Sequence, residues 1–310
     1  VNPANLTITA DDKGKTFGDA NPPLTATYSG LTGGDTTGSD LDTDTTLDTA
    51  ADATSDAGAY TITASGAADG NYTITENNGT LTVNQRPLTL TASQQNKTFG
   101  ESLTLDNTAF TVTDADGDAT LPGGNTVDTV SVASASGNDA DTTADAGTYA
   151  DDLFISGQSG SGGFSASNYA ITNVDGDLVI DSASLTITAA DKGKTFGDAN
   201  PSLTATYSGL TGGDTTGSDL DTDTTLDTAA DATSDAGAYT ITASGAADGN
   251  YTITENNGTL TVNQRPLTLT ASQQNKTFGE SLTLDNTAFT VTDADGDATL
   301  PGGNTVDTVS

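Results

Sequence analysis

A long internal repeat constrains the fold of this chain more than any other feature. Residues 6–131 match residues 185–310 at a constant offset of 179, and only Asp11 (Ala190 in the copy) and Pro23 (Ser202) differ. Two nearly identical segments adopt the same local structure, and tandem copies each form a folding unit that contacts its neighbours. The sequence therefore predicts an array of repeats.

A weaker repeat lies inside the long one. The sequence Lys-Thr-Phe-Gly at residues 15–18 returns at residues 97, 194 and 276. Asp-Ala-Gly and Asn-Tyr motifs recur downstream of it, at residues 56 and 71 and again at residues 145 and 168. Two kinds of module, A and B, thus alternate. The predicted segments are 1–4 (the end of a preceding module or a linker), 5–85 (A1), 86–183 (B1), 184–264 (A2) and 265–310 (B2, incomplete). We expect the chain to be an internal stretch of a longer array.

Apolar residues recur with a period of two. Leu6, Ile8 and Ala10 alternate with threonines, and several later runs repeat the pattern. Such alternation is typical of half-buried strands. With six or seven short strands per module, the sequence predicts an all-β chain of small immunoglobulin-like β-sandwich modules arranged in a rod. Modules of a β-grasp type, with one short helix, are the alternative.

Short turn signals separate the last two strands of each module. Asn78 and Gly79 lie between two alternating runs in A1, and Asp175 and Gly176 do so in B1. Asn-Gly and Asp-Gly are the strongest signals for a two-residue hairpin. We therefore predict that these runs pair with each other.

The composition excludes several classes of function. The chain has 43 acidic and 8 basic residues, a formal charge of −35, and neither His nor Cys. It cannot form a Ser-His-Asp triad, a thiolate nucleophile, an imidazole or thiolate zinc site or a disulfide. The negative charge would repel a phosphate backbone, so nucleic acid is not an expected partner. No apolar run of about 18 residues predicts a membrane segment. We predict no catalytic residues and no required cofactor.

Acidic loops are the candidate metal sites. Closely spaced carboxylates offer the oxygen ligands that Ca²⁺ accepts in irregular geometry. An EF-hand does not fit, because Gly117 stands at the fourth position of its loop and Asn125 at the twelfth. The alternative is that these aspartates stabilise turns and remain solvated. The candidate ligands are Asp40, Asp42 and Asp44 in A1, and Asp114, Asp116, Asp118, Asp139 and Asp141 in B1.

Lysines and tyrosines allow one functional and one structural interpretation each. Lys13, Lys15 and Lys97 could form isopeptide bonds, or they could be surface or turn lysines paired with nearby aspartates. The tyrosines could stack on sugars, or they could belong to the core and its edges, as their phase in the strands favours. These are Tyr28, Tyr60 and Tyr72.

The A module resembles MBG-type repeats. The resemblance rests on Lys-Thr-Phe-Gly-Asp-Ala-Asn-Pro at residues 15–22, the Ala-Gly-Ala-Tyr run from residue 57, and Asn-Tyr-Thr-Ile at residues 71–74. B modules share the first and last of these in part. Such repeats occur in very large secreted or surface-anchored bacterial proteins, including adhesins, so the resemblance implies an extracellular location at a bacterial surface.

The repeats favour a structural function over catalysis. We expect a segment of an adhesin stalk or surface fibre whose partners are further copies of the repeats in the same chain and neighbouring chains in a fibre. A spacer gains directly from copy number. One alternative is a multivalent module that binds a glycan, a mucin or neighbouring cells. Another is a filament subunit in which strand exchange between chains completes the half-module B2.

Overall fold

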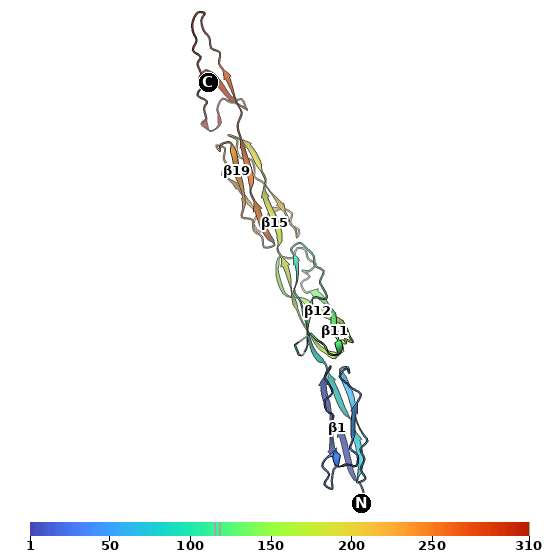
Figure 1. Ribbon diagram of the computed structural model, residues 1–310. Helices are drawn as coiled ribbons and strands as arrows, with labels where there is room; N and C mark the ends of the chain where they lie inside the picture. The colour runs from blue at the N-terminus through green and yellow to red at the C-terminus, as the bar shows by residue number, and fades with distance from the viewer. Residues whose placement is uncertain (115, 118, 310) are drawn as a thin grey trace. The chain divides into compact units, whose positions relative to one another are not determined.

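The computed structural model describes residues 1–114, 116–117 and 119–309, and its strands belong to an all-β fold (Figure 1). Within these residues there is no α-helix, only short 3₁₀ turns. Two compact units emerge. Unit 1 contains residues 1–96, 103–140 and 148–179, and unit 2 contains residues 97–102, 141–147 and 180–310. The prediction of tandem β-sandwich-like repeats is confirmed.

Each A module has seven strands in two sheets. In A1 these are β1 (Ala4–Ala10), β2 (Lys13–Thr16), β3 (Ala26–Ser29), β4 (Thr46–Thr49), β5 (Gly58–Ser65), β6 (Tyr72–Asn77) and β7 (Gly79–Asn84), with the 3₁₀ turn η1 (Gly38–Asp40). In A2 they are β15 (Ala183–Ala189), β16 (Lys192–Thr195), β17 (Ala205–Ser208), β18 (Thr225–Thr228), β19 (Gly237–Ser244), β20 (Tyr251–Asn256) and β21 (Gly258–Asn263), with η4 (Gly217–Asp219).

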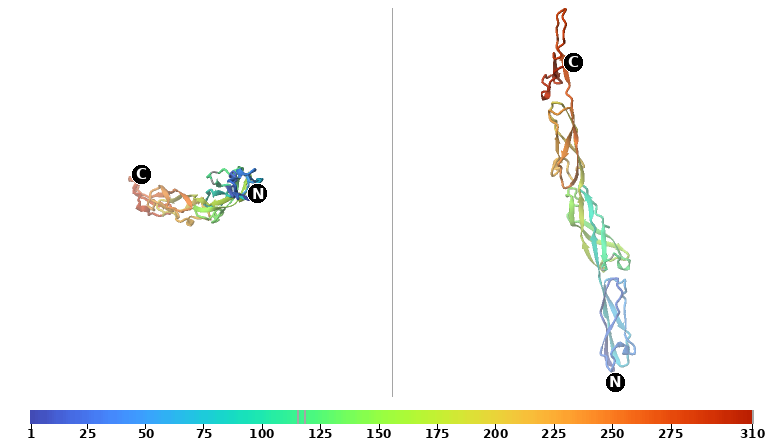
Figure 2. Two further views of the ribbon diagram at one scale, coloured as in Figure 1. Left: turned by 90° about the horizontal axis from the view of Figure 1, so that it is seen from below. Right: turned by 60° about the vertical axis from the view of Figure 1, so that its left-hand side comes forward.

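The two sheets of A1 have the strand orders β3-β1-β6 and β2-β7-β5-β4. Figures 1 and 2 show the strands of A1, in blue, running along the length of this module. The alternating apolar side chains of β1 point between the sheets, where Ile8 is fully buried and Ala10 packs with Ile62 and Leu81 of the other sheet. The period of two in the sequence is thus the alternation between core and solvent.

B1 has the same plan. Its described strands are β8 (Arg86–Ala92), β9 (Gln95–Thr98), β10 (Phe110–Asp114), β11 (Thr126–Ser134), β12 (Gly147–Ser161), β13 (Tyr169–Val174) and β14 (Gly176–Asp181), with η2 (Pro122–Gly124) and η3 (Ala166–Asn168). The sheets have the orders β10-β8-β13 and β11-β12-β14-β9. Within the described residues of B2, β22 (Leu267–Ala271) and β23 (Phe289–Asp293) form a two-stranded sheet, and η5 (Pro301–Gly303) follows them.

The predicted hairpins are wrong. β6 pairs in parallel with β1, whereas β7 pairs with β5 and β2 in the other sheet. Residue 78 therefore crosses between the sheets. A Cβ on Gly79 would lie 2.4 Å from the main-chain oxygen of Ala10, so the glycine is needed for a close approach between backbones and not for a tight turn. β13 and β14 of B1 are likewise in different sheets, with Gly176 close to Ala92.

Candidate functional site

Three motifs that recur in the modules lie at module ends and form the contacts of A1 with B1 and of B1 with A2. Three parts form each contact, which we call a joint. The preceding module supplies a Phe-Gly turn (Phe17 and Gly18, Phe99 and Gly100, or Phe196 and Gly197) and an Asp-Ala pair (Asp56 and Ala57, Asp145 and Ala146, or Asp235 and Ala236). The following module supplies an Asn-Tyr pair (Asn168 and Tyr169 of B1, or Asn250 and Tyr251 of A2).

The A1–B1 joint, in unit 1, centres on a buried asparagine. Asn168 at the end of η3 is 1% exposed. Its Oδ1 accepts a hydrogen bond from the backbone N–H of Ala57 at 2.9 Å, and its Nδ2 donates to Oδ1 of Asp56 at 2.7 Å. The Asn168 side chain thus forms hydrogen bonds with two polar groups of the residues just before β5, the Ala57 N–H and the Asp56 carboxylate. Leaving such groups unpaired in a buried joint would cost free energy.

Aromatic rings fill the rest of this joint. The ring of Tyr169 meets Phe17 edge-on with 5.5 Å between centroids and stacks on Phe164 at 5.3 Å. The Tyr169 hydroxyl donates to Oδ1 of Asn125 at 3.2 Å. Because Tyr169 pairs with Arg86 in the parallel ladder of β13 and β8, the strand register sets the position of the ring. Such ring pairs contribute about 0.5–1.5 kcal/mol beyond their buried area.

The B1–A2 joint lies in unit 2, which includes residues 97–102 and 141–147 of B1. Oδ1 of Asn250 accepts from the backbone N–H of Ala146 at 2.7 Å, and its Nδ2 donates to Asp145 at 3.1 Å. Tyr251 meets Phe99 edge-on with 5.4 Å between centroids. The same contacts therefore join A to B and B to A.

The Phe-Gly turn fits closely against the next module. Gly18 has a φ of +90°, and a Cβ on it would lie 2.4 Å from the ring of Pro122. Phe99 packs against the backbone of Gly212, where an added Cβ would lie 2.3 Å from the ring. The equivalent position in A1, Gly33, has nothing within 4 Å of such a Cβ. The same glycine is therefore crowded in A2, where the joint brings Phe99 against it, and open in A1.

Where an A module precedes a B module, the joint also contains an arginine. Arg86 is buried, and its Nε and Nη2 donate to Oδ2 of the buried Asp114 at 3.1 and 3.0 Å. It also forms ion pairs with Asp19 of A1 at 3.4 Å and with Asp116. Burial acts to lower the pKa of Arg86, but the hydrogen bond and charge of Asp114, with Asp116 and Asp19, raise it above its ordinary value.

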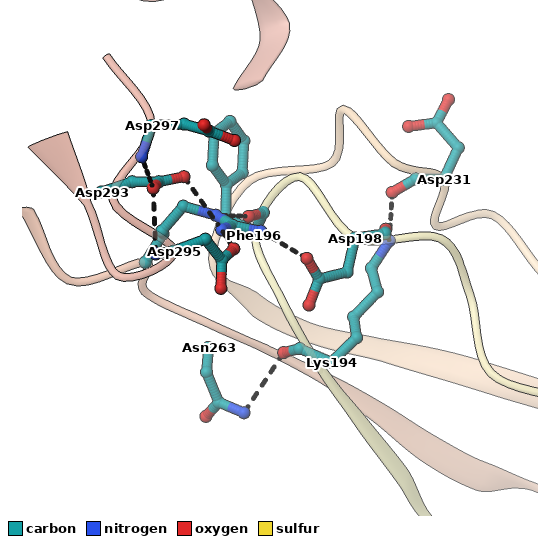
Figure 3. Close-up of polar contacts among 9 residues, drawn as sticks. Lys194, Phe196, Asp198, Asp231, Asn263, Asp293, Asp295 and Asp297 are labelled. Carbon is teal, nitrogen blue, oxygen red and sulfur yellow. Dashed lines mark hydrogen bonds and ion pairs between the residues drawn. The ribbon is translucent and has the colours of Figure 1, made fainter. Parts of the chain in front are cut away.

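Arg265 holds the A2–B2 joint in the same way. Its Nε donates to the main-chain oxygen of Phe196 at 2.7 Å, and its guanidinium pairs with Asp293 at 3.1 Å, Asp295 at 2.8 Å and Asp198. Figure 3 shows these acceptors converging from the Phe-Gly turn and from the end of β23. The hydrogen bond from Arg265 to Asp295 raises the arginine pKa above its ordinary value.

The lysines next to the Phe-Gly turns of A1, B1 and A2 are buried, whereas Lys276 of B2 is exposed. Lys15 is 7% exposed, and its Nζ donates to the main-chain oxygens of Asp19, at 3.1 Å, and Asp52. Lys194 does the same in A2, and Lys97 donates to the main-chain oxygen of Asp141. Lys15 and Lys97, which the sequence allowed as surface or turn lysines, are therefore buried, and they bond to main-chain oxygens of nearby aspartates. Main-chain oxygens are also not the groups that an isopeptide bond joins.

The candidate calcium ligands of A1 take part in local hydrogen bonds. Asp40 accepts from the backbone N–H groups of Thr36 and Thr37, and these bonds hold its pKa below the ordinary value. Asp42 accepts from the N–H of Gly70 at 3.4 Å, and Asp44 accepts from the Tyr28 hydroxyl. Each carboxylate therefore stabilises a different turn or loop.

The candidate ligands of B1 are divided between several contacts. Asp114 and Asp116 meet at Arg86, and Asp141 accepts from the N–H of Thr143 at 2.8 Å, which lowers its pKa. The main-chain oxygen of Asp139 accepts from Leu103. Asp118 lies outside the described residues. In the described part of the chain, no group of three or more acidic side chains is placed to hold a metal ion, and calcium binding stays a prediction.

Sequence reasoning found the joint motifs but not their role. The tyrosine of the Asn-Tyr pair was expected at the core or its edge, and Tyr72 and Tyr169 are indeed buried. The signal that could have revealed the joint is the recurrence of the polar residues of the Asp-Ala-Gly and Asn-Tyr motifs in both A and B. Core positions such as Leu6 and Leu88, or Leu81 and Leu178, are also shared, but burial within the module explains them. The position of both arginines at the A-to-B boundaries was a second signal.

Comparison with known proteins identifies the modules. No helix within the described residues is long and apolar enough to cross a membrane. No curated protein matches the chain. Three segments, residues 6–82, 88–179 and 185–261, match the model of the MBG domain (YGX type), and together they cover most of the chain. Both A modules and B1 are included, which confirms the resemblance seen in the sequence. The chain therefore belongs to the MBG domain (YGX type) family, as a tandem array of its domains.

Proposed function

We propose that the chain is a spacer segment of an extracellular bacterial surface protein, in an adhesin stalk or surface fibre. The observation that carries the proposal is the joint, whose contacts recur from A1 to B1 and from B1 to A2. A joint built from the same residues at successive boundaries resists bending at each of them. Each added module then lengthens the array and forms one more joint of the same kind.

The chemistry of the joints suits this function. Asn168 and Asn250 form directional hydrogen bonds to the preceding module, and the edge-on aromatic pairs restrict rotation about the joint. The MBG domain is a structural module type, and no catalytic activity is proposed for this chain. The acidic surface would keep a long array soluble and prevent association through like charges.

Surface display tests the proposal against multivalent binding. The 310-residue chain, and longer chains with one or two additional A–B pairs, would be anchored to cells with a fluorophore at the far end. The proposal predicts that the height of the fluorophore above the cell rises by an equal step with each pair. It also predicts that adhesion of the cells to mucin does not increase with copy number.

Two results would contradict the spacer function. One is a height that stays constant as pairs are added. The other is saturable binding of a glycan or mucin by an isolated A module, with avidity that grows with the number of modules. The second result would favour the multivalent binding module.

A further inference from the structure

The A1 module has a groove on the side where one edge of each sheet faces the other. The two edge strands are β3 and β4, and among the described residues β3 pairs only with β1 and β4 only with β5. The groove between them has a volume of about 620 Å³. Its apolar wall contains Leu24, Ala26 and Leu47, and its polar end contains Tyr28, Asp44 and Thr45. A2 has the same residues at all of these positions, and none of them belongs to a joint.

In B1 the chain itself closes this side of the sandwich. The edge strands there are β10 and β11. Asn107 accepts hydrogen bonds from two main-chain N–H groups of β11, with its main-chain oxygen from Val130 and with its Oδ1 from Val132, both at 3.0 Å. Leu103 and Leu105, just before it, pack against the core. A polypeptide segment therefore covers the edge in B1, and Val130 and Val132 are buried.

The corresponding edge of A1, β4, is open within the described residues. Ala64 of β5 donates its N–H to Oδ1 of Asn78, on the side of β5 that faces β7. In an antiparallel ladder this directs the main-chain groups of its partner Leu47 away from β5, toward the open edge. Leu24 and Leu47 are only half-buried. An edge with directed main-chain groups beside exposed apolar side chains accepts an additional strand.

The polar end of the groove carries negative charge. The Tyr28 hydroxyl donates to Oδ1 of Asp44, and Oγ1 of Thr45 donates to Oε1 of the half-buried Glu76 at 2.6 Å. A Cβ on Gly38 would lie 2.3 Å from the Tyr28 hydroxyl, so the backbone of η1 packs over this pair. Burial, the hydrogen bond to Asp44 and the charges of Asp44 and Glu76 raise the pKa of Tyr28. The tyrosine therefore stays protonated, and the two carboxylates favour a cation at this end.

We propose that each A module binds an extended basic segment of a partner protein, with one lysine or arginine side chain in the groove. The segment would pair with the open edge of β4 through the main-chain groups of Leu47. The aliphatic part of the inserted side chain would contact Leu24 and Leu47, and its charged end would reach Asp44. A second copy of the chain does not fit, because its formal charge of −35 would be repelled.

The open strand edge favours a polypeptide over a glycan as the occupant. Main-chain groups of an extended segment can continue the ladder of β4, as Asn107 does for β11 in B1. A neutral sugar would neither continue the ladder nor neutralise Asp44. Two sites in one chain, in A1 and in A2, would attach the array to a partner along its length. This binding goes beyond the spacer function and does not depend on it.

A seven-residue peptide of alternating threonine and lysine tests the proposal. It would be titrated into the 310-residue chain and followed by two-dimensional amide NMR. We expect saturable binding with shifts of the Leu47 and Leu226 amides, while the amide of Val132 stays unchanged because Asn107 already occupies it. A peptide with norleucine in place of lysine keeps the aliphatic stem but lacks the charge, and it should bind at least tenfold more weakly.

Matched chain variants separate the groove from the general acidity of the surface. Asp44→Asn combined with Asp223→Asn should weaken binding of the lysine peptide at least tenfold. Asp48→Asn combined with Asp227→Asn is the control, since it removes the same charge from exposed positions of β4 and β18 that do not line the groove. The control chain should bind the lysine peptide as the unaltered chain does.

Three results would overturn the proposal: no binding of the lysine peptide, binding without shifts at Leu47 and Leu226, or equal binding of the norleucine peptide. Equal weakening by the Asp44 and Asp48 variant pairs would also overturn it, because the peptide would then respond only to the overall charge. A shift of the same amides by a neutral chitin oligosaccharide, and not by the peptide, would assign the groove to a glycan instead. The height measured by surface display depends on none of these results.

Discussion

At the scale of the residue, two asparagines at the same position of the A module make different contacts, because one of them lies at a joint and the other does not. Asn71 and Asn250 occupy the same position in A1 and A2, within the same Asn-Tyr-Thr-Ile sequence. Asn250 bonds to Ala146 and Asp145 of the preceding module, whereas Asn71 is exposed. The role of this residue cannot be read from its own sequence, because the partner belongs to another module.

Substitution of these two asparagines measures how much the joint contributes to the free energy of unfolding. Asn250→Ala should destabilise unit 2 by about 1–3 kcal/mol, because it removes the two hydrogen bonds of the Asn250 amide to the Ala146 N–H and the Asp145 carboxylate. Asn71→Ala should change stability by less than about 0.5 kcal/mol. Urea denaturation measures both, and hydrogen exchange at the Ala146 amide should accelerate only in Asn250→Ala. Equal effects of the two substitutions would mean that the asparagine acts within its own module.

A tyrosine of the B1–A2 joint should make stability depend on alkaline pH. Burial, assisted by the hydrogen bond to Asp214, raises the pKa of Tyr251 to about 12 from an ordinary value of 10. Since the folded state holds this proton more tightly, the stabilisation is complete below pH 10 and is lost as the pH rises toward 12. Tyr251→Phe should flatten the stability of A2 over this range. An NMR titration in which the Tyr251 ring titrates near pH 10 would contradict the assignment.

At the scale of the element, strands were predictable but their partners were not. Alternation of apolar residues predicted the strand of Leu6, Ile8 and Ala10 correctly, because burial on one face of a strand is a local property. The prediction of a hairpin at Asn78 and Gly79 was wrong because β6 and β7 belong to different sheets. A turn signal does not specify which edge of which sheet a strand joins. The parallel pairing of β1 with β6 connects residues far apart in sequence, and no local signal marks it.

The Phe-Gly turn offers a matched test at this scale. Gly18 and Gly279 have φ values of +90° and +85°, so replacement by alanine strains both backbones similarly. Only Gly18 faces a neighbour, the ring of Pro122 at 2.4 Å from an added Cβ. Gly18→Ala should therefore cost about 1–3 kcal/mol more than Gly279→Ala, because overpacking must open the A1–B1 joint. Thermal unfolding of the two variants measures the difference, and equal losses would place the turn outside the joint.

At the scale of the whole molecule, the compact units do not follow the sequence repeats. Unit 2 includes residues 97–102 and 141–147 of B1, because these residues carry the Phe-Gly turn and Asp-Ala pair that contact A2. The division into compact units therefore depends on the contacts at the joints as well as on the sequence repeats. We infer that the hydrogen bonds and ring contacts of the A1–B1 joint restrict the motion of A1 relative to B1.

Electron spin resonance across the A1–B1 joint tests this central claim most directly. The chain has no cysteine, so Thr61→Cys in A1 and Thr172→Cys in B1, both exposed, provide two unique sites for spin labels. The account predicts one narrow distance distribution, which broadens when Asn168→Ala removes the bonds to Asp56 and Ala57 but stays narrow in the control Asn71→Ala. A broad distribution in the unaltered chain, or one that Asn168→Ala leaves unchanged, would contradict it.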